Sequence, residues 1–191
     1  MPRTFDVPLS HLAFVVLLAF AAFAQDQVDA GDRVTLIDHE LVDQTGQKQR
    51  FVSDVIGDKK AVIAGIYTGC TTICPITTLL FAELQDALGT RLEKEVRLIS
   101  LSVDPAHDTP SMLADAAAEI DAKPGWFWLT GPPALQNEVL FGIGAYSSDI
   151  TEHPPVFVVG DGATGEFVQL YGFPSVEEFL GLLVGSEGGP S

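Results

Sequence analysis

The sequence predicts an α/β fold in which one central mixed β-sheet is flanked by helices. Three observations support this prediction. Continuous apolar runs alternate with segments of helical periodicity, an order typical of α/β domains. The chain closes with a hairpin pattern and a helical pattern, which adds antiparallel strands to the sheet. The 191 residues are 47% hydrophobic and 19% charged, which is enough apolar material for one sizeable core.

The N-terminal segment, residues 1–24, is expected to be a leader that precedes this domain. Arg3 provides a basic start, Leu12–Ala24 is an apolar run, and Ala22–Ala24 forms a small-x-small cleavage pattern. The run is short for a membrane span, which needs about 20 residues. We therefore expect a signal peptide, with an uncleaved membrane anchor as the alternative. Both place the domain in the periplasm or cell envelope, where disulfides persist.

The rest of the chain divides into three parts. Residues 25–32 are expected to be a polar linker, residues 33–185 one domain, and residues 186–191 a disordered tail. At the start of the domain, residues 34–51 alternate partly around a Gln-Thr-Gly turn, which predicts an N-terminal β-hairpin. Residues 61–68 form a continuous apolar run, which predicts a buried strand.

The later elements follow in strand–helix order. After residue 74, apolar residues recur at helical spacing up to Gly89, a residue type that favours helix termination. The next helix has Asp108 or Thr109 as its N-cap and Pro110 at its first position. This order is the thioredoxin-like pattern. The expected elements are a strand at 95–103, a helix at 108–125, a strand at 126–130, a helix at 133–146, a hairpin at 155–172 and a helix at 175–185 capped by Ser175.

The charge of the chain excludes one class of partner. The formal net charge is −16, and it stays −16 without residues 1–24, which hold one acid, Asp6, and one base, Arg3. Such a surface repels phosphate backbones, so we expect no binding of nucleic acid. It suits a protein that meets cations or basic partners.

The only two cysteines, Cys70 and Cys74, stand directly after the first buried strand. Pro75 indicates a helix start, because a proline in the first helical turn removes no hydrogen bond. Cys74 is therefore expected at or just before the helix start, and Cys70 in the loop that leads to it. The free N–H groups and the dipole of a helix start favour the thiolate, which is both the nucleophile and the metal ligand.

Several functions fit this pair. A structural disulfide would close a very small loop and so would stabilise little. A thiol-disulfide oxidoreductase would use Cys70 as the attacking thiol and Cys74 as the resolving thiol. A metal site needs at least one further ligand. A peroxidase of the peroxiredoxin type is a weaker option, since Arg91 and Arg97 are expected at the far end of the sheet from the cysteines.

His153 is the best candidate for a third metal ligand. It stands immediately before two prolines and a buried strand. In a thioredoxin-like fold this segment faces the cysteine loop and often carries a cis proline. His11 lies in the leader, and His39 and His107 fit solvated positions. Two thiolates and one imidazole suit copper, as Cu(I) or, with an added ligand, as Cu(II), whereas a closed zinc site would need a fourth ligand.

Four motifs follow one another over residues 33–183. They are Tyr67-Thr-Gly-Cys70-Thr-Thr-Ile-Cys74-Pro75, then Leu98–Pro110 with its Asp-Pro-x-x-Asp-Thr-Pro element, then Trp126–Gly131, then His153 before the last hairpin. In this order they resemble the Sco/SenC family. The resemblance implies a thioredoxin-like domain that binds one copper ion through Cys70, Cys74 and His153.

The resemblance also implies partners. Members of the family assist the assembly of the copper site of cytochrome c oxidase, so the copper subunit of that enzyme or another copper protein is the expected recipient. Some bacterial members look more like thiol-disulfide reductases or sensors. Because an oxidised cysteine pair cannot bind copper, a thioredoxin-like reductant is a further expected partner.

The chain departs from the family pattern in two places. Many members keep Asp-His-Ser at the histidine, where this chain has Glu-His153-Pro. Many members keep a membrane anchor, where this leader resembles a signal peptide. Asp104 and Asp108 match the acidic motif of the family. We expect Asp104 to lie near the metal site, behind the ligands, and Asp108 to serve the turn and the helix cap.

Overall fold

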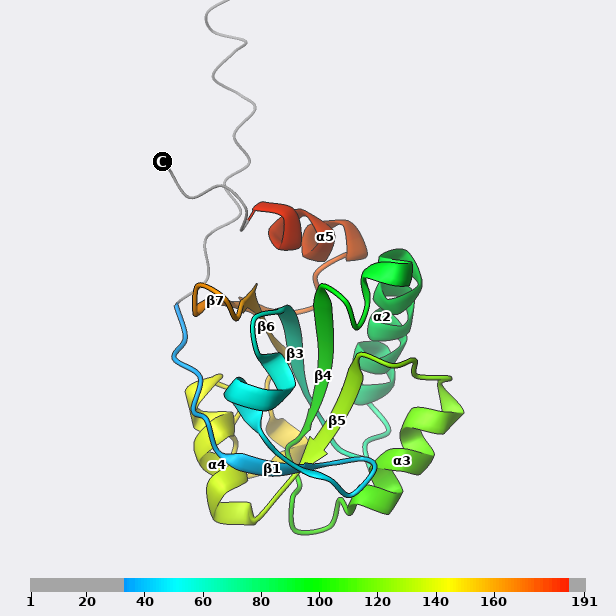
Figure 1. Ribbon diagram of the computed structural model, residues 1–191. Coiled ribbons are helices and arrows are strands. Elements are labelled where there is room, and N and C mark those ends of the chain that lie inside the picture. Colours follow the sequence, from blue (N-terminus) through cyan, green and yellow to red (C-terminus); the bar gives the residue numbers. More distant parts are fainter. Residues whose placement is uncertain (1–32, 186–191) are drawn as a thin grey trace, which may run out of the picture. The chain divides into compact units, whose positions relative to one another are not determined.

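The computed structural model describes residues 33–185, which form one β-sheet with helices on both faces (Figure 1). The expected leader, linker and tail lie outside the described residues. Within the described part, no helix combines the length and the apolar character needed to cross a membrane.

The sheet is mixed and has seven strands in the order β2-β1-β5-β4-β3-β6-β7. The three central strands, β5, β4 and β3, are parallel, and every other neighbouring pair is antiparallel. The predicted α/β fold with a central mixed sheet and an N-terminal hairpin is confirmed. The strands are β1 Glu40–Asp43, β2 Lys48–Arg50, β3 Lys60–Ile66, β4 Val96–Ser102, β5 Trp126–Thr130, β6 Val156–Asp161 and β7 Glu166–Tyr171.

Helices α2, α3 and α5 pack on one face of the sheet, and η1 and α4 pack on the other. The starts of α3 and α5 follow the predicted signals, whereas α3 and α4 end at Glu119 and Gly142, before the predicted residues 125 and 146. The Thr109 hydroxyl accepts the Met112 N–H at the start of α3, and Ser175 and Glu178 cap α5 reciprocally. The helices are η1 Phe51–Ile56, α2 Ile73–Leu88, η2 Gly89–Arg91, α3 Pro110–Glu119, α4 Pro133–Gly142, η3 Ile150–Glu152 and α5 Val176–Gly185.

A buried core fixes α2 to the sheet. Phe81 of α2 is fully buried, and its ring centroid lies 5.7 Å from that of Trp126 and 6.0 Å from that of Phe157. Trp126 belongs to β5 and Phe157 to β6, so one aromatic side chain joins the helix to two separate strands. Cys74 lies seven residues earlier on the same helix, which is about two turns. The position of this cysteine therefore depends on the packing of Phe81.

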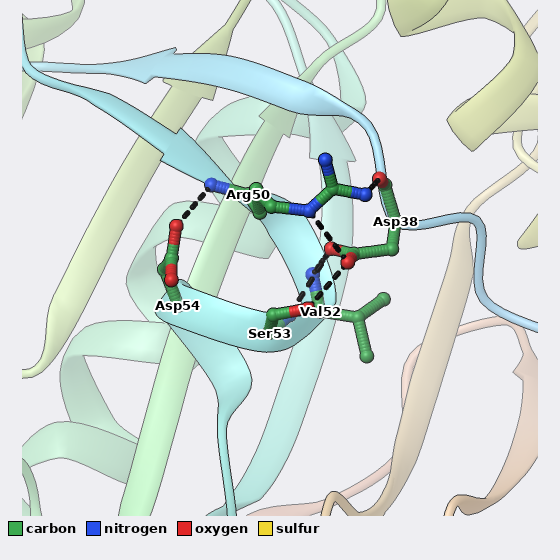
Figure 2. Close-up of polar contacts among 5 residues, drawn as sticks. All are labelled: Asp38, Arg50, Val52, Ser53 and Asp54. Atoms are coloured by element: carbon green, nitrogen blue, oxygen red, sulfur yellow. Dashed lines mark hydrogen bonds and ion pairs between the residues drawn. The ribbon is translucent and has the colours of Figure 1, made fainter.

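The N-terminal hairpin is shorter than predicted, because its second strand leads into the π-helical turn η1 at Phe51. Figure 2 shows how Asp38 holds the start of this turn. Its carboxylate accepts the N–H groups of Val52 and Ser53, at 2.8 and 3.1 Å, and also binds the Ser53 hydroxyl. Arg50 Nε donates to the same carboxylate at 2.9 Å. These bonds satisfy N–H groups that a helix start leaves free.

Replacing Asp38 with asparagine is expected to destabilise the domain in a pH-dependent way. Burial raises the pKa of Asp38, but hydrogen bonds from Ser53, Arg50 and Val52 outweigh this and hold the pKa well below its usual range. The stabilisation is therefore present above the unfolded pKa of about 3.9 and is lost as the pH falls through the folded pKa. We expect Asp38→Asn to lower the free energy of unfolding by about 1–2 kcal/mol at neutral pH.

Urea denaturation at neutral pH and at a pH below about 4 tests this prediction. The difference between wild type and Asp38→Asn should shrink in acid. Asp86→Asn is the control, because Asp86 is exposed on α2. A deficit of the same size at both pH values would show that the charge of Asp38 is not the cause.

Candidate metal centre

The cysteine loop follows the carboxyl end of a central parallel strand, where α/β sheets place their sites. β3 ends at Ile66, and α2 begins at Ile73. Cys70 lies in the loop between them, and Cys74 is the second residue of α2, slightly further into the helix than predicted. The Cys74 N–H donates to Cys70 Sγ at 3.3 Å. A helix start that directs an N–H group at a sulfur stabilises the thiolate.

His153 lies beside the two cysteines. It follows η3 and precedes β6, which pairs antiparallel with β3 and so begins near the cysteine loop. His153 Nε2 lies 3.8 Å from Cys74 Sγ, and its ring packs edge-on against Tyr67. One ligand atom from each of Cys70, Cys74 and His153 lies within 4.8 Å of the other two. The structure thus brings together the three residues that the sequence suggested.

The expected cis proline is absent. No peptide bond within residues 33–185 is cis, so Pro154 and Pro155 both follow trans bonds. The chain turns instead through η3, where the Asp149 carboxylate accepts the Thr151 N–H at 2.9 Å. His153 then has an extended backbone, as a residue before proline prefers. The imidazole reaches the cysteines without a cis bond.

The two thiols differ in burial and acidity. Cys74 is buried and Cys70 is half-buried. Burial raises the pKa of Cys70, but hydrogen bonds from Cys74 and Thr72 outweigh this effect and lower the pKa to about 7. Burial, together with the neighbouring Cys70, raises the pKa of Cys74 to about 12. Near neutral pH, a substantial fraction of Cys70 is therefore thiolate, whereas Cys74 is the protonated thiol.

The imidazole of His153 is in the form that binds metal. Burial lowers its pKa, against a smaller opposing effect of the Pro154 backbone, so the ring is neutral near pH 7. Its Nδ1 is buried and has no hydrogen-bond partner within the described residues. Two sulfurs and a neutral imidazole nitrogen fit a soft ion of low coordination number, such as Cu(I).

Asp108 supports the cysteine loop from the protein interior. It is 4% exposed, and one carboxylate oxygen accepts both the N–H and the hydroxyl of Thr68, at 3.1 and 2.6 Å. The other oxygen accepts the Ser102 hydroxyl at 2.6 Å. Asp108 thereby links the end of β4 to the loop that leads to Cys70. The sequence assigned this residue to a helix cap, but the cap is Thr109.

Asp104, which the sequence places near the metal site and behind the ligands, lies in the same loop as Asp108. Its carboxylate binds Nδ1 of the exposed His107 at 2.8 Å. Both acids of the Asp-Pro-x-x-Asp element thus lie in the loop after β4. The spacing could have drawn attention to Asp108, but it could not show which of the two side chains turns inward.

Replacing Asp108 with alanine is expected to loosen the cysteine loop. The variant leaves the Thr68 N–H and two hydroxyls without their acceptor, so the free energy of unfolding should fall by about 2–4 kcal/mol. Asp108→Asn keeps a carbonyl oxygen for Thr68 and should recover most of this loss. Urea denaturation of the two variants checks the prediction. Equal losses would show that the negative charge, and not the hydrogen bonding, is what matters.

The other candidates from the sequence lie elsewhere. His39 Nε2 binds the Glu138 carboxylate at 2.7 Å, and His107 binds Asp104. Arg91 lies in η2 before β4 and Arg97 near the start of β4, at the opposite end of the strands from the cysteine loop. Within residues 33–185, the peroxidase alternative therefore lacks the arginine that it needs beside the thiolate.

Comparison with known proteins agrees with this geometry. The family model for SCO1/SenC matches residues 27–154. A SCO1 protein homolog of Bacillus subtilis (strain 168) is 42% identical over 67 residues, which are 35% of this chain. The chain covers 34% and 43% of the lengths of two curated relatives that it matches.

Solved structures share the whole domain. One of them is BsSco, which is described as a member of the Sco family of cytochrome c oxidase assembly proteins with a disulfide switch. It superposes on this chain with a TM-score of 0.69 and is 22% identical in sequence. The match covers 84% of this chain and 98% of BsSco. ScoI of Bradyrhizobium japonicum with copper bound gives 0.64 at 25% identity, covering 82% and 99%. The fold is therefore thioredoxin-like. From the extent of the match to the family model, the chain belongs to the SCO1/SenC family.

Proposed function

We propose that this protein binds one copper ion through Cys70, Cys74 and His153 and assists the assembly of the copper site of cytochrome c oxidase. The observation that carries the proposal is the convergence of two sulfurs and one imidazole nitrogen within 4.8 Å. Relatives support it, since ScoI of Bradyrhizobium japonicum and yeast Sco1 are known with copper bound. BsSco is described as belonging to a family of cytochrome c oxidase assembly proteins.

Copper is the cargo in this proposal, and the residues of the chain account for how it is held. Thiol ligands must be deprotonated, so binding releases the proton of Cys74, while Cys70 is already partly thiolate near neutral pH. The imidazole of His153 is already neutral, so one of its nitrogens can supply a lone pair to the ion without losing a proton. Cys70 is the more accessible sulfur, so a recipient thiolate can approach the ion from that side and replace the ligands in turn.

The proposal includes a reductant and a location. Only the dithiol form can hold copper, so a thioredoxin-like partner must reduce a Cys70–Cys74 disulfide in an oxidising compartment. The residue pattern of the leader supports the periplasm or cell envelope, with the domain either released or tethered. Fractionation of cells followed by N-terminal sequencing of the mature protein tests both points.

A transfer experiment tests the proposed role. The copper-loaded protein is mixed anaerobically with the apo form of the soluble copper domain of cytochrome c oxidase, and copper is measured on each protein after separation. The proposal predicts that copper moves to the oxidase domain. The apo domain is used in its reduced form for this transfer, and in its oxidised form in a parallel reaction with the copper-free, reduced protein. If the reduced domain gains no copper, but the disulfide of the oxidised domain is reduced, the protein acts as a reductase.

This second function, a thiol-disulfide oxidoreductase, is favoured by the difference between the two thiols. A half-buried Cys70 with a pKa of about 7 suits the attacking thiolate, and a buried Cys74 suits the resolving thiol. The two functions share the same reduced state, so they are not mutually exclusive. They differ in their need for His153, which only copper binding requires.

Alkylation tests the assignment of the two thiols. With iodoacetamide in slight excess, the modification rate of Cys70 should rise with pH around a midpoint of about 7, whereas Cys74 should stay largely unmodified. Mass spectrometry of peptides separates the two sites. Parallel modification of both cysteines, or a midpoint near the ordinary thiol value of about 8.5, would contradict the assignment.

A further inference from the structure

An apolar groove opens beside the cysteine pair, between α2 and α3. Its volume is about 390 Å³, and both cysteines line it. The floor comes from the ends of β3 and β5, and the walls come from the first turns of α2 and the last turns of α3. We call it the α2–α3 groove. Apart from the cysteines, the lining side chains used below are Tyr67, Leu79, Glu119, Ile120 and Trp128.

The α2–α3 groove and the two helices that form it expose apolar side chains that the domain core does not use. Leu79 is 57% exposed and lines the groove, and Ile76, one turn earlier on α2, is 51% exposed. Met112 on α3 is 42% exposed. Two aromatic residues, Tyr67 and Trp128, also line it. An apolar groove that is lined by aromatic side chains is typical of a site that receives a side chain of a partner protein.

The charged residues of α2 and α3, the two helices that form the α2–α3 groove, are all acidic. The single carboxylate that lines the groove is Glu119, and Asp115 is exposed one turn earlier on α3. No lysine or arginine occurs at residues 61–90, 98–122 or 124–185. The lysines and arginines within residues 33–185 instead precede or begin the parallel strands, or lie near the edges of the sheet. They are Arg33, Lys48, Arg50, Lys59, Lys60, Arg91, Lys94, Arg97 and Lys123.

From the groove and the charges together, we infer that the α2–α3 groove docks a cysteine-bearing segment of a partner protein in which apolar residues lie beside lysine or arginine. The apolar side chains would enter the groove, and the basic ones would face Glu119 and Asp115. Because Cys70 lines the groove, the docked cysteine would lie next to the reactive sulfur. The inference rests on the proposed function, since it identifies the chemistry of the partner for the same site.

The exchange that docking would promote is balanced in atoms and electrons. The Cys70 thiolate attacks a disulfide of the partner, which forms a mixed disulfide and releases one partner thiolate. Cys74 then loses its proton and attacks Cys70, which forms the Cys70–Cys74 disulfide and releases the second partner thiolate. The partner is reduced by two electrons, and this protein is oxidised by two. With copper in place of the disulfide, the same docking would set up ligand exchange.

Three synthetic pentapeptides test the inference. Each carries a central cysteine as a mixed disulfide with thionitrobenzoate, whose release by the reduced protein is followed by absorbance. The first peptide has the sequence Lys-Leu-Cys-Leu-Lys, the second Glu-Leu-Cys-Leu-Glu, and the third Lys-Ser-Cys-Ser-Lys. At low salt, the first should react on the order of tenfold faster than the second, and the preference should weaken as salt screens the charges. It should also react faster than the third.

Variants locate the effect at the α2–α3 groove. The double variant Asp115→Asn, Glu119→Gln should lose most of the preference for lysine over glutamate, and Leu79→Ser should lose the preference for leucine over serine. Asp86→Asn is the matched control, since it removes one negative charge from the other end of α2 and should change neither preference. Equal rates for all three peptides, or preferences that survive the groove variants, would overturn the inference.

Copper binding by the same variants separates this inference from the proposed function. The groove substitutions leave the three ligand residues in place, so one copper per chain should still bind. If the wild-type protein binds copper but prefers none of the peptides, the docking inference is wrong and the copper proposal stands. A clear peptide preference in a wild-type protein that binds no copper would defeat the copper proposal and leave the groove as the docking site of an oxidoreductase.

Discussion

Replacing His153 with alanine is expected to lower the affinity for Cu(I) on the order of 100- to 1,000-fold, while the Cys70–Cys74 pair keeps its disulfide chemistry. The binding free energy of zinc at structural sites with four ligands is roughly 10–16 kcal/mol. Removing one of three ligands should therefore weaken the binding free energy of the ion by several kcal/mol. The Cys74 N–H at the start of α2 donates to Cys70 Sγ, and this bond between the two cysteines does not involve the imidazole. Competition with a chromophoric Cu(I) chelator measures the affinity.

His107→Ala is the matched control for this prediction. The His107 side chain is 78% exposed and binds Asp104, so its loss should leave copper affinity unchanged. The rate at which a small dithiol reduces the Cys70–Cys74 disulfide should be similar in both variants. If His153→Ala bound copper as tightly as His107→Ala does, the three-ligand site would be wrong.

Replacing Phe81 with alanine is expected to lower the free energy of unfolding by about 3–5 kcal/mol. Phe81 is fully buried and packs against Trp126 and Phe157, so the variant opens a cavity where α2 meets two strands. A domain has a total stability of roughly 5–15 kcal/mol, so much of it would be lost. Urea denaturation measures this loss.

Leu79→Ala is the control on the same helix, because Leu79 is 57% exposed and its truncation leaves no cavity in the core. We expect a change of less than about 0.5 kcal/mol. The Phe81 variant should also bind copper more weakly where it is still folded, because the helix that carries Cys74 is less firmly held. A loss of stability as small as that of Leu79→Ala would contradict the role given to this core contact.

Much of the fold could be predicted from the sequence, because its signals are local. Continuous apolar runs mark β3 and β4, and Thr109 and Ser175 cap their helices as their side-chain oxygens predict. The turn η1 could not be predicted in this way. It depends on Asp38, which lies 14 residues before Val52, the residue whose N–H it accepts. A bond between residues so far apart leaves no local pattern.

The candidate site could also be predicted only in part from the sequence. Pro75 indicated a helix start at the cysteines, and the order of strands brought His153 to them. The inward turn of Asp108 could not be predicted, since its partners Thr68 and Ser102 come from two other segments. The sequence predicted that the helix start favours the thiolate of both cysteines. This holds for Cys70, whose pKa is lowered, and is wrong for Cys74, whose pKa is raised by burial that only the packing of the domain determines.

The central claim is that Cys70, Cys74 and His153 form one copper site. The measurement that tests it most directly is the copper content of the anaerobically reduced protein after passage over a chelator, beside Cys70→Ala and His153→Ala. We expect one copper per chain in the wild type and loss of tightly bound copper in both variants. It would be contradicted by a wild-type protein that retains no copper although its Cys70–Cys74 disulfide is readily reduced. The pair would then serve thiol-disulfide exchange alone.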